Sequence, residues 1–354
     1  MNFFEDKKVF VTGHTGFKGT WLLHLLKHLG ANVKGFALPA HHPSLFNITK
    51  AAEFCKHVEG DIRNKNDLEK ELLDFEPDFV FHLAAQPLVL DSYKDPVYTF
   101  EVNQMGTVYL LDALKKLDKT CTCIVVTTDK VYKDQNKFEG YLETDTVGGF
   151  DPYSASKAGC ELIVDSYRNS FFHPEKYLKH RKSIATARAG NVIGGGDFAE
   201  NRLIPDIIKS IEKNRKVVIR NPEAIRPWQH VLDALYAYLV LAKQVYENPA
   251  NDVLNAAWNF GPFAEDIWPV LEVAKNAIQN YGKGEICIEK NSNAPKETSR
   301  LVLDISKALE FLPWKPKWDA EIAIKKTVEW YAHYNQSPKT IQELMDRQIK
   351  IFLD

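Results

Sequence analysis

The amino-acid sequence predicts an α/β fold built on a doubly wound parallel sheet, followed by a smaller mixed α/β lobe. Short apolar runs typical of strands alternate with helical patterns from Lys8 to about Arg188, as in a parallel sheet with crossover helices. A glycine-rich turn directly follows the first run. Beyond residue 188 the elements become shorter and more varied. We therefore expect a sheet domain over 1–188, with some later segments returning to it, and a second lobe formed mainly by 189–354.

The predicted strands are short apolar runs, as expected for a parallel sheet that is covered on both faces. They span 8–12, 32–37, 76–84, 123–128 and 183–189, and a further short strand ends before Gly60. Helical spacing of apolar residues predicts helices over 21–29, 103–117 and 153–172. In the second lobe we expect a loop at 194–197, helices over 203–213 and 231–246, and a strand over 217–220. Trp314, Trp318 and Trp330 are expected to lie in the core.

The composition favours a protein that binds neither nucleic acid nor a membrane. The chain has 354 residues, with 45 basic and 47 acidic side chains and a formal net charge of −2. This balance gives no sign of a polyanion-binding surface. No apolar run is long enough to span a bilayer, and the N-terminal segment lacks the apolar region of a secretory signal. The five scattered cysteines fit a reducing compartment, so we expect a cytoplasmic protein.

Three glycines at positions 13, 16 and 19 follow the first strand and open the first helix. Glycines at this spacing allow a tight turn, close approach of backbone N–H groups to a pyrophosphate, and close packing of helix on strand. The helix N-terminus adds a favourable positive end. An ordinary tight turn is the alternative, but the position after the first strand favours a Rossmann-type NAD-binding domain. The expected cofactor contacts in this turn are Gly13, Thr15, Gly16, Phe17, Lys18 and Gly19.

The second strand lacks the acidic residue that often binds the adenosine ribose of a dinucleotide. It ends with Gly35-Phe-Ala-Leu-Pro-Ala-His-His-Pro, which contains neither an acid nor an arginine. The choice between NAD and NADP therefore stays open, with NAD expected. Further cofactor contacts are predicted close to the ends of later strands, where small residues let a ligand approach the backbone. They are Asp61 and Ile62 near the adenine, and Leu83, Ala84, Ala85, Gln86, Asn103 and Thr127.

Tyr153 and Lys157 stand at i and i+4, so they share one face of the predicted helix. A free tyrosine titrates near pH ~10. The Lys157 ammonium and an oxidised nicotinamide would both favour the phenolate and lower the pKa of Tyr153. A phenolate that forms closer to neutral pH can take the proton of a sugar hydroxyl while hydride leaves the same carbon. We therefore predict that Tyr153 and Lys157 are catalytic and that both also contact the cofactor.

Thr128, Asp129 and Lys130 follow the strand that precedes this helix. Ligands bind beyond the carboxyl ends of the strands in open α/β sheets. An acid and a potential base at one strand end can supply general acid and base catalysis. An ordinary ion pair in a surface turn is the alternative. The topology favours the first interpretation, so we predict that all three residues are catalytic.

Several motifs together resemble the extended short-chain dehydrogenases/reductases and, within them, the nucleotide-sugar 4,6-dehydratases. They are GHTGFKGTWL (13–22), PSLF (43–46), HLAAQPLV (82–89), TTDKVY (127–132), YSASKAGCE (153–161), ARAGNVIGGGD (187–197), NRLIPD (201–206) and IRPWQHV (225–231). The resemblance covers nearly the whole chain. Most of these dehydratases have Thr-Asp-Glu where this chain has Thr-Asp-Lys at 128–130, and the lysine resembles the CDP-glucose branch.

The resemblance implies an NAD-dependent hydro-lyase that converts a nucleotide sugar, CDP-D-glucose in that branch, to its 4-keto-6-deoxy form. Tyr153 takes the 4-hydroxyl proton while hydride passes from C4 to NAD⁺. Lys130 then removes the C5 proton, Asp129 protonates the leaving C6 hydroxyl, and hydride returns to C6. The implied substrate contacts are Gln86, Thr128, Asn191, Arg202 and Arg226. For Arg202 an exposed surface position is an equal alternative. Where the family has a later His-Glu segment, this chain has Pro-Lys-Glu-Thr at 295–298.

The resemblance also implies an assembly and a biological setting. The helices over 103–117 and 153–172 carry broad apolar faces, and their pairing across a two-fold axis would make a homodimer, or a dimer of dimers. The implied setting is deoxysugar biosynthesis, including that of lipopolysaccharide O-antigen. No metal site is expected, because His24 and His28 stand at i, i+4 spacing without an adjacent Glu and are typical of a solvated helix face.

Three other functions stay open. The first is a 4,6-dehydratase that acts on a GDP-, UDP- or dTDP-linked sugar. The second is a 4-epimerase, which needs Tyr153, Lys157 and NAD but no elimination pair, so Asp129 and Lys130 speak against it. The third is a non-catalytic NAD(H)-binding sensor, which an intact tyrosine and lysine disfavour.

Overall fold

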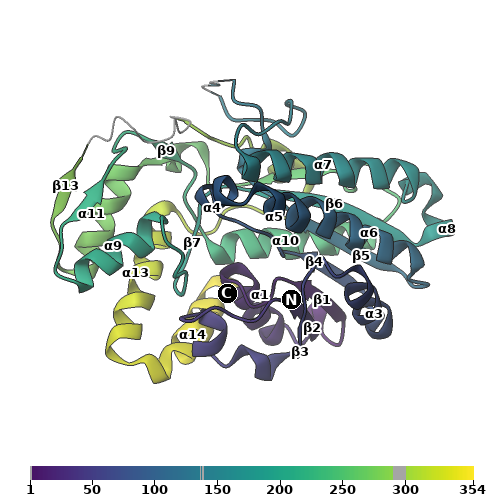
Figure 1. Ribbon diagram of the computed structural model, residues 1–354, viewed down its shortest axis with the longest axis horizontal. Helices are drawn as coiled ribbons and strands as arrows, with labels where there is room; N and C mark the ends of the chain where they lie inside the picture. Colours follow the sequence, from purple (N-terminus) through teal and green to yellow (C-terminus); the bar gives the residue numbers. More distant parts are fainter. Residues whose placement is uncertain (1, 136, 138, 290–299) are drawn as a thin grey trace.

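A seven-stranded parallel sheet forms the centre of the computed structural model, which describes residues 2–135, 137, 139–289 and 300–354 (Figure 1). The strand order is β11-β6-β5-β4-β1-β2-β3, and all neighbours are parallel. The strands are β1 (Lys8–Thr12), β2 (Asn32–Ala37), β3 (Lys56–Glu59), β4 (Phe79–His82), β5 (Cys121–Val126), β6 (Lys182–Ala189) and β11 (Ala257–Phe260). The chain reverses direction across the sheet between β1 and β4. Ligands of open α/β sheets bind at this switch point.

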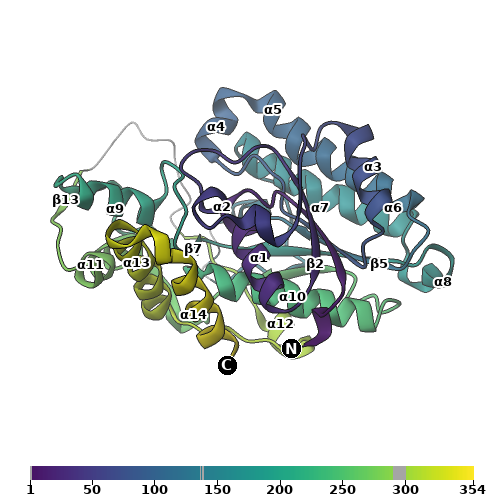
Figure 2. The same ribbon diagram turned by 90° about the horizontal axis from the view of Figure 1, so that it is seen from below.

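Helices cover both faces of the sheet. Helices α3 (Lys65–Phe75), α6 (Gly106–Lys116) and α7 (Pro152–Ser170) pack on one face, and α1 (Phe17–His28) and α10 (Val231–Glu247) pack on the other (Figures 1 and 2). Side chains alternate between the two faces along each strand. Phe10 and Val80 therefore pack in the core beneath α3, α6 and α7, while Val9 and Phe79 pack in the core beneath α1 and α10. Because both faces are buried, β1, β2, β4, β5 and β6 are rich in apolar residues, which is why the sequence located these five strands within three residues.

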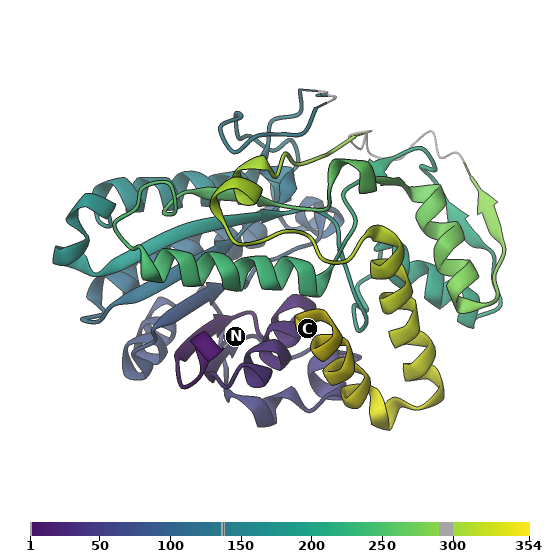
Figure 3. The ribbon, with the colours of Figure 1, turned by 180° about the vertical axis from the view of Figure 1, so that it is seen from behind.

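The second lobe is built from elements that follow β6 and gathers at one end of the sheet (Figures 1 and 3). Three two-stranded sheets pair β7 with β10, β9 with β12, and β8 with β13. The elements are β7 (Val192–Ile193), α9 (Leu203–Glu212), β8 (Val217–Ile219), β9 (Ile225–Arg226), β10 (Gln229–His230), β12 (Trp268–Pro269), α11 (Val270–Tyr281), β13 (Ile286–Ile288), α13 (Ala320–Gln336) and α14 (Ile341–Leu353). Between them, α10 and β11 return to the main sheet, where β11 pairs with β6.

Short elements complete the chain, and some of them were not predicted. The remaining α-helices are α2 (Leu45–Ile48), α4 (Val89–Lys94), α5 (Pro96–Phe100), α8 (Tyr177–His180) and α12 (Ser306–Phe311). Single turns occur at η1 (Asn2–Phe4), η2 (Ala51–Phe54), η4 (Asp129–Val131), η5 (Pro174–Lys176), η6 (Ala264–Asp266) and η7 (Pro338–Thr340), and η3 (Glu101–Met105) is a π-helix. The sequence interpretation missed α4, α5 and the strand β11. Among the described residues, no helix has both the length and the hydropathy to cross a membrane.

The structure contradicts the prediction that His24 and His28 form a solvated helix face. His28 is exposed, but His24 is only 1% exposed and its ring packs 5.0 Å from the ring of Phe54. Burial lowers the pKa of His24 to about 3, so the side chain is neutral. The helix α1 is covered on a second side by η2 and α14, which its own periodicity could not reveal. Within the described part of the chain, no group of three His, Cys, Asp or Glu side chains could hold a metal ion.

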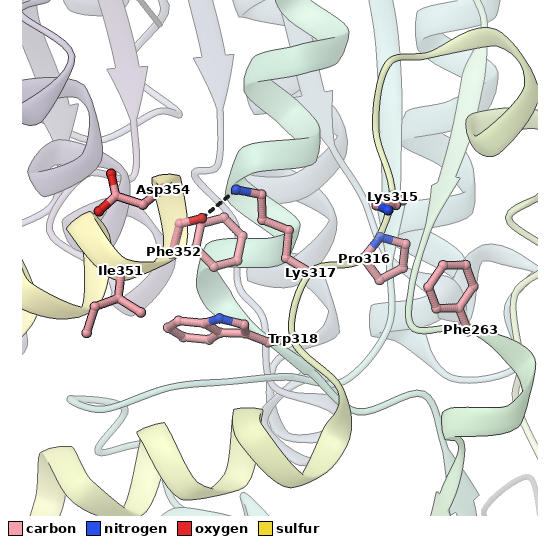
Figure 4. Close-up of a pocket in the computed structure, with 8 residues that line it drawn as sticks. All are labelled: Phe263, Lys315, Pro316, Lys317, Trp318, Ile351, Phe352 and Asp354. Atoms are coloured by element: carbon pink, nitrogen blue, oxygen red, sulfur yellow. Dashed lines mark hydrogen bonds between the residues drawn. The ribbon is translucent and has the colours of Figure 1, made fainter.

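The C-terminal tail is anchored beside α10 by a polar contact and aromatic packing. Figure 4 shows the crevice where residues 315–318 meet the end of α14, with Lys317 Nζ donating to the Phe352 carbonyl at 2.6 Å. The Lys317 amide donates to Asp233 Oδ1 at 2.7 Å, and the Trp318 ring lies 5.0 Å from that of Phe352. Trp314, Trp318 and Trp330 are all buried, which confirms their prediction as core residues.

Candidate active site

The glycine turn joins β1 to α1 and cannot accept side chains at its first and third glycines. Gly13 has φ +75°, and a Cβ there would lie 2.6 Å from the Ala84 amide nitrogen. A Cβ at Gly19 would lie 2.2 Å from the Gly13 carbonyl oxygen. Gly16 is different, because it is exposed and caps α1 without a side chain. The first amides of a 12-residue helix are therefore open to an anion, with no acidic residue in the first turn.

The side chains between these glycines reach neighbouring elements. The Thr15 hydroxyl donates to the Leu38 carbonyl at 2.9 Å, which ties the turn to the end of β2. Phe17 packs towards the loop after β7, because a Cβ at Gly194 would meet its ring at 3.0 Å. Lys18 Nζ lies 3.5 Å from the hydroxyl of Tyr238 in α10. Burial, together with the charges of Arg202 and Lys157, lowers the pKa of Lys18 to about 7, and the Asp129 charge acts in the opposite direction.

Histidines lie behind the turn at the place where the second strand lacks an acid. His14 Nε2 is 2.7 Å from His57 Nδ1, and His57 Nε2 is 3.5 Å from the Glu59 carboxylate. A Cβ at Gly35 would overlap the His14 ring at 2.3 Å, so Gly35 makes room for that ring. Burial lowers the pKa of His14 to about 3. The cofactor turn of this chain is therefore backed by a neutral imidazole.

The predicted adenine-side residues lie beyond β3. The Asp61 carboxylate is held by Arg63 through an Nη2–Oδ2 contact of 2.7 Å, which lowers the pKa of Asp61. Ile62 is buried against Gly106, the first residue of α6. On the next strand, the Ala84 amide donates to the Thr12 hydroxyl at 3.2 Å, which holds residues 83–85 close to β1 and the glycine turn.

Gln86 and Asn103 bond to each other instead of pointing freely into the site. The Gln86 amide donates to Asn103 Oδ1 at 2.8 Å, and Asn103 Nδ2 donates to the Gln86 carbonyl and to Ser156 Oγ, at 3.2 and 2.8 Å. Gln86 Nε2 donates to Thr99 and Leu88. Asn103 lies on the π-helix η3, a form that occurs mostly at functional sites. The pair joins the loop after β4 to α7 one turn from Tyr153.

Tyr153 and Lys157 lie in the first two turns of α7, which Asp151 caps by accepting the Ser154 amide at 2.9 Å. Tyr153 is 8% exposed, and burial raises its pKa to about 12, although a hydrogen bond from Thr128 and the charge of Arg202 act in the opposite direction. In the protein alone, desolvation of the phenolate outweighs the nearby cations. The predicted lower pKa includes the charge of an oxidised nicotinamide, so it stays a prediction for the complex.

Lys157 is anchored to the end of β5. Its Nζ donates to the Val126 carbonyl at 3.1 Å, and the side chain is buried. Burial lowers the pKa of Lys157, while Cys160 and Glu161 raise it. The ammonium therefore lies beside the residues that follow β5, one turn along α7 from Tyr153.

Thr128, Asp129 and Lys130 form the turn η4 at the end of β5. The Thr128 hydroxyl donates to Asp129 Oδ1 at 2.9 Å, and its oxygen also lies within hydrogen-bonding reach of Tyr153, which lowers the pKa of the phenol. Asp129 is 2% exposed, and its Oδ2 has no hydrogen-bond partner within the described residues. A Cβ at Gly190 would lie only 3.2 Å from that oxygen. The alternative of a surface ion pair is therefore wrong, because the carboxylate is buried beside Tyr153 and does not pair with Lys130.

The predicted substrate residues come from the loops of the second lobe. Arg202 is 39% exposed at its side chain and lies 4.0 Å from Asp197, and its charge lowers the pKa of both Lys18 and Tyr153. This proximity is compatible with a substrate contact, which stays a prediction for this partly exposed side chain. Arg226, in β9, is 6% exposed, and the Asn191 carbonyl accepts the Gln229 amide at 3.1 Å. The segment 295–298 lies outside the described residues.

Sequence reasoning missed two buried residues near the site. The Tyr238 hydroxyl contacts Lys18 Nζ. Burial raises the pKa of Tyr238, and the charges of Tyr153 and Asp129 raise it as well. Glu161 bonds to Thr127. The sequence held one sign of these residues, which is that each places a polar group on an otherwise apolar face of its helix. Neither spacing nor composition indicated a partner for them.

A doubly wound parallel sheet, a glycine turn at its switch point and a buried Tyr-Lys pair together define a short-chain dehydrogenase/reductase fold and site. A family model described as GDP-mannose 4,6 dehydratase matches residues 10–327. The chain belongs to this family.

Two known proteins of similar sequence are sugar-nucleotide dehydratases. A CDP-glucose 4,6-dehydratase of Salmonella typhimurium is 44% identical over 331 residues, which cover 93% of this chain and 92% of that protein. A dTDP-glucose 4,6-dehydratase of the same organism is 25% identical over 346 residues, or 92% of each chain. The crystal structure of a dTDP-glucose 4,6-dehydratase from Bacillus anthracis in complex with NAD superimposes with a TM-score of 0.77 at 23% identity, covering 96% of this chain and 99% of that one. This last likeness concerns the fold alone.

Proposed function

We propose that this protein is a CDP-glucose 4,6-dehydratase, which converts CDP-D-glucose to CDP-4-keto-6-deoxy-D-glucose and water. The observation that carries the reaction type is the position of the Thr128 hydroxyl, which touches both Tyr153 and Asp129. A group for oxidation and a group for elimination thus meet at one strand end. The choice of CDP-glucose is supported by the similarity to the Salmonella enzyme, which extends over nearly the whole chain.

The residues of the glycine turn fit a nicotinamide dinucleotide. Gly16 leaves the N-terminus of α1 bare, and the packing at Gly13 and Gly19 holds the backbone close to the ends of β1 and β4. We assign the pyrophosphate to the turn Gly13–Gly19 and the adenine to Asp61 and Ile62. When bound, NAD accepts the hydride from C4 and returns it to C6, so the reaction has no net redox change.

Tyr153 removes the proton of the 4-hydroxyl. Its pKa of about 12 in the protein alone means that the phenol is protonated until a positive charge enters the site. An oxidised nicotinamide would bring that charge, in addition to the Lys157 ammonium and the Thr128 hydroxyl, which are already part of the site in the free protein. The buried tyrosine thus becomes a base only in the assembled complex. This arrangement keeps the phenol inactive in the free enzyme.

Elimination is assigned to Asp129 and Lys130. The ketone at C4 acidifies the C5 proton, which Lys130 removes in its neutral form. Asp129 donates a proton to the C6 hydroxyl, which leaves as water, and Lys130 returns its proton to C5 when C6 is reduced. The buried Oδ2 of Asp129, free of other hydrogen bonds in the described structure, is available to this hydroxyl. After the product leaves, the proton that Tyr153 took from the 4-hydroxyl replaces the one that Asp129 gave up, so the proton balance closes without another reagent.

The second lobe supplies the nucleotide-sugar contacts in this proposal. Arg202 and Arg226 are suited to the diphosphate, because a guanidinium binds phosphate oxygens in a forked geometry. We assign Asn191 to the sugar, and Gln86 to the loop after β4 beside it, which the Gln86 side chain holds in place. We assign residues 1–188 to the NAD-binding domain and 189–354 mainly to this nucleotide-sugar lobe.

The test offers NAD⁺ with CDP-, UDP-, GDP- or dTDP-glucose and measures 4-keto sugar by its absorbance in alkali. We expect product from CDP-glucose. Product from another nucleotide sugar alone would contradict the assignment of cytosine as the nucleotide base of the substrate. K130A should lower product formation by about 100-fold or more, while nicotinamide reduction in the first turnover persists. The matched control is K133A, an exposed lysine of the next loop, which should behave as wild type. If K130A formed 4-keto sugar at the rate of the wild type, Lys130 could not be the group that removes the C5 proton.

We further propose that the enzyme is a cytoplasmic homodimer, paired through α7 and its neighbours. Leu90, Tyr93, Val97, Met105 and Leu162 on α4, α5, η3 and α7 are apolar side chains between 40% and 66% exposed, and these elements adjoin one another. Such an apolar surface is typical of an interface.

The oligomeric state is tested by light scattering after size exclusion. L162E should produce monomers, whereas L178E, at a 91% exposed position on α8, should leave the assembly unchanged. A mass of four chains in the wild type would indicate a dimer of dimers. A monomeric wild type would refute this assembly.

A further inference from the structure

A buried carboxylate, Glu161, lies one turn beyond Lys157 on the sheet-facing side of α7. Tyr153, Lys157 and Glu161 stand at successive i, i+4 positions of the helix, so they form a single stripe. Glu161 is 6% exposed. The proposed reaction uses the first two residues of the stripe and leaves the third without a role.

Glu161 is fully supplied with donors from two strands. Thr127 Oγ1 donates to its Oε1 at 2.5 Å, and Thr186 Oγ1 and Arg188 Nη2 donate to its Oε2 at 2.7 and 2.9 Å. Burial raises the pKa of Glu161, but the Arg188 charge and these hydrogen bonds outweigh it, so the pKa lies below its ordinary value. The side chain is therefore a stable buried anion that joins α7 to β5 and β6.

Arg188 extends the connection to the loop that follows the catalytic turn. Its Nη1 donates to the Tyr132 hydroxyl at 2.8 Å and to the Glu143 carbonyl at 3.1 Å. The Tyr132 hydroxyl in turn donates to Asn259 Oδ1 of β11 at 2.7 Å. The guanidinium thus fixes the chain on the far side of Thr128–Lys130.

Two successive turns of α7 therefore hold the last residue of β5, Val126, and the residue that follows it, Thr127. Lys157 bonds to the Val126 carbonyl at 3.1 Å and Glu161 bonds to the Thr127 hydroxyl at 2.5 Å. The next residues along the chain are Thr128 and Asp129. The alignment of the oxidation pair with the elimination pair depends on these two contacts. The Glu161 charge also raises the pKa of Lys157, against the effect of burial.

We propose that Glu161, held by Arg188, is a positioning residue for the reaction. It sets α7 against the end of β5 and keeps Lys157 protonated, so that the ammonium can support the Tyr153 phenolate. The inference rests on the proposed function of Tyr153 and Lys157 and adds a residue that touches neither substrate nor cofactor. A purely structural ion pair would stabilise the fold without affecting the ionisation of Lys157.

The first variant is Glu161→Gln, which keeps the shape and removes the charge. We expect kcat to fall at least ten-fold, with KM for the nucleotide sugar within about three-fold of wild type. The high-pH limb of the kcat profile should move to lower pH by about one unit, because Lys157 loses its proton more easily. Thr186→Val is the matched control, since it removes one hydrogen bond to the same carboxylate but leaves the charge, and its limb should stay in place.

The second variant protects the test against misfolding. Breaking a buried pair at one end leaves an unpaired charge and destabilises a protein strongly, whereas replacing both partners is often tolerated. Glu161→Gln combined with Arg188→Met should therefore fold and still show the shifted limb. A wild-type profile in this double variant, or in Glu161→Gln, overturns the proposal.

NADH binding measured against pH separates this proposal from the proposed function. The affinity of Glu161→Gln for NADH should begin to fall at a lower pH than that of wild type, even in the absence of any sugar. If the wild type makes no keto sugar but the binding profile shifts, the dehydratase assignment fails and the positioning role stands. If the wild type is active and neither profile shifts, the positioning role fails.

Discussion

The hydroxyl of Thr128 should set the pH at which Tyr153 becomes a base. The T128V variant keeps the size of the side chain and removes the hydrogen bond that lowers the pKa of Tyr153. A hydrogen bond to a charged group contributes about 1.5–3 kcal/mol, and a pKa difference of one unit corresponds to about 1.4 kcal/mol. The pKa of Tyr153 should therefore rise by roughly 1–2 units. Because the phenolate is the active form, the low-pH limb of the rate should move upward by the same amount.

The assay is the pH dependence of nicotinamide reduction in a single turnover, which reports the oxidation step alone. At pH 7, on the slope of that limb, the rate of T128V should fall about 10- to 100-fold. T128S retains the hydroxyl and should keep the limb of the wild type. A T128V limb that coincides with that of the wild type would refute the reasoning. A fall in rate by the same factor at every pH would mean that Thr128 orients the substrate without affecting the ionisation of Tyr153.

Two further predictions concern stability and cofactor binding. Burial raises the pKa of Asp233 to about 7, so the folded state holds a proton that the unfolded state has lost. The stability of the wild type should then fall as the pH rises from about 4 to about 7. D233N should remove up to roughly 3 kcal/mol of the fall that urea unfolding measures between pH 5 and pH 8. Equal pH dependence of the two proteins would contradict the assignment. G19A places a Cβ 2.2 Å from the Gly13 carbonyl and should weaken NADH binding at least ten-fold in a fluorescence titration. Its control is G282A, where a Cβ meets nothing within 4 Å; the strain of φ +84° should cost about 1 kcal/mol of stability and leave NADH binding unchanged.

Much of the site follows from local pattern, but the ionisation states within it do not. The spacing of Tyr153 and Lys157 predicts that they share a helix face, and they do. The high pKa of Tyr153 depends on how completely the second lobe and the loop after β5 exclude water, which no spacing encodes. Arg202 illustrates the same limit, because the sequence around it is equally compatible with an exposed surface position and with a substrate contact. Its coupling to Lys18 and Tyr153 appears only once the lobe is folded against the sheet.

Local sequence pattern was enough to predict the parallel sheet, the glycine turn at its switch point and the helix face that Tyr153 and Lys157 share. These features depend on periodicity and on residue types over a few neighbours, and a buried parallel strand is apolar whatever surrounds it. The tertiary structure alone decided which side chains meet. It brought β11 beside β6, buried His24 under a second helix, and gave Glu161 its donors on β5 and β6. Such contacts join residues 25 or more positions apart, as for Thr186 and Glu161, and their energy depends on burial that only the complete fold produces.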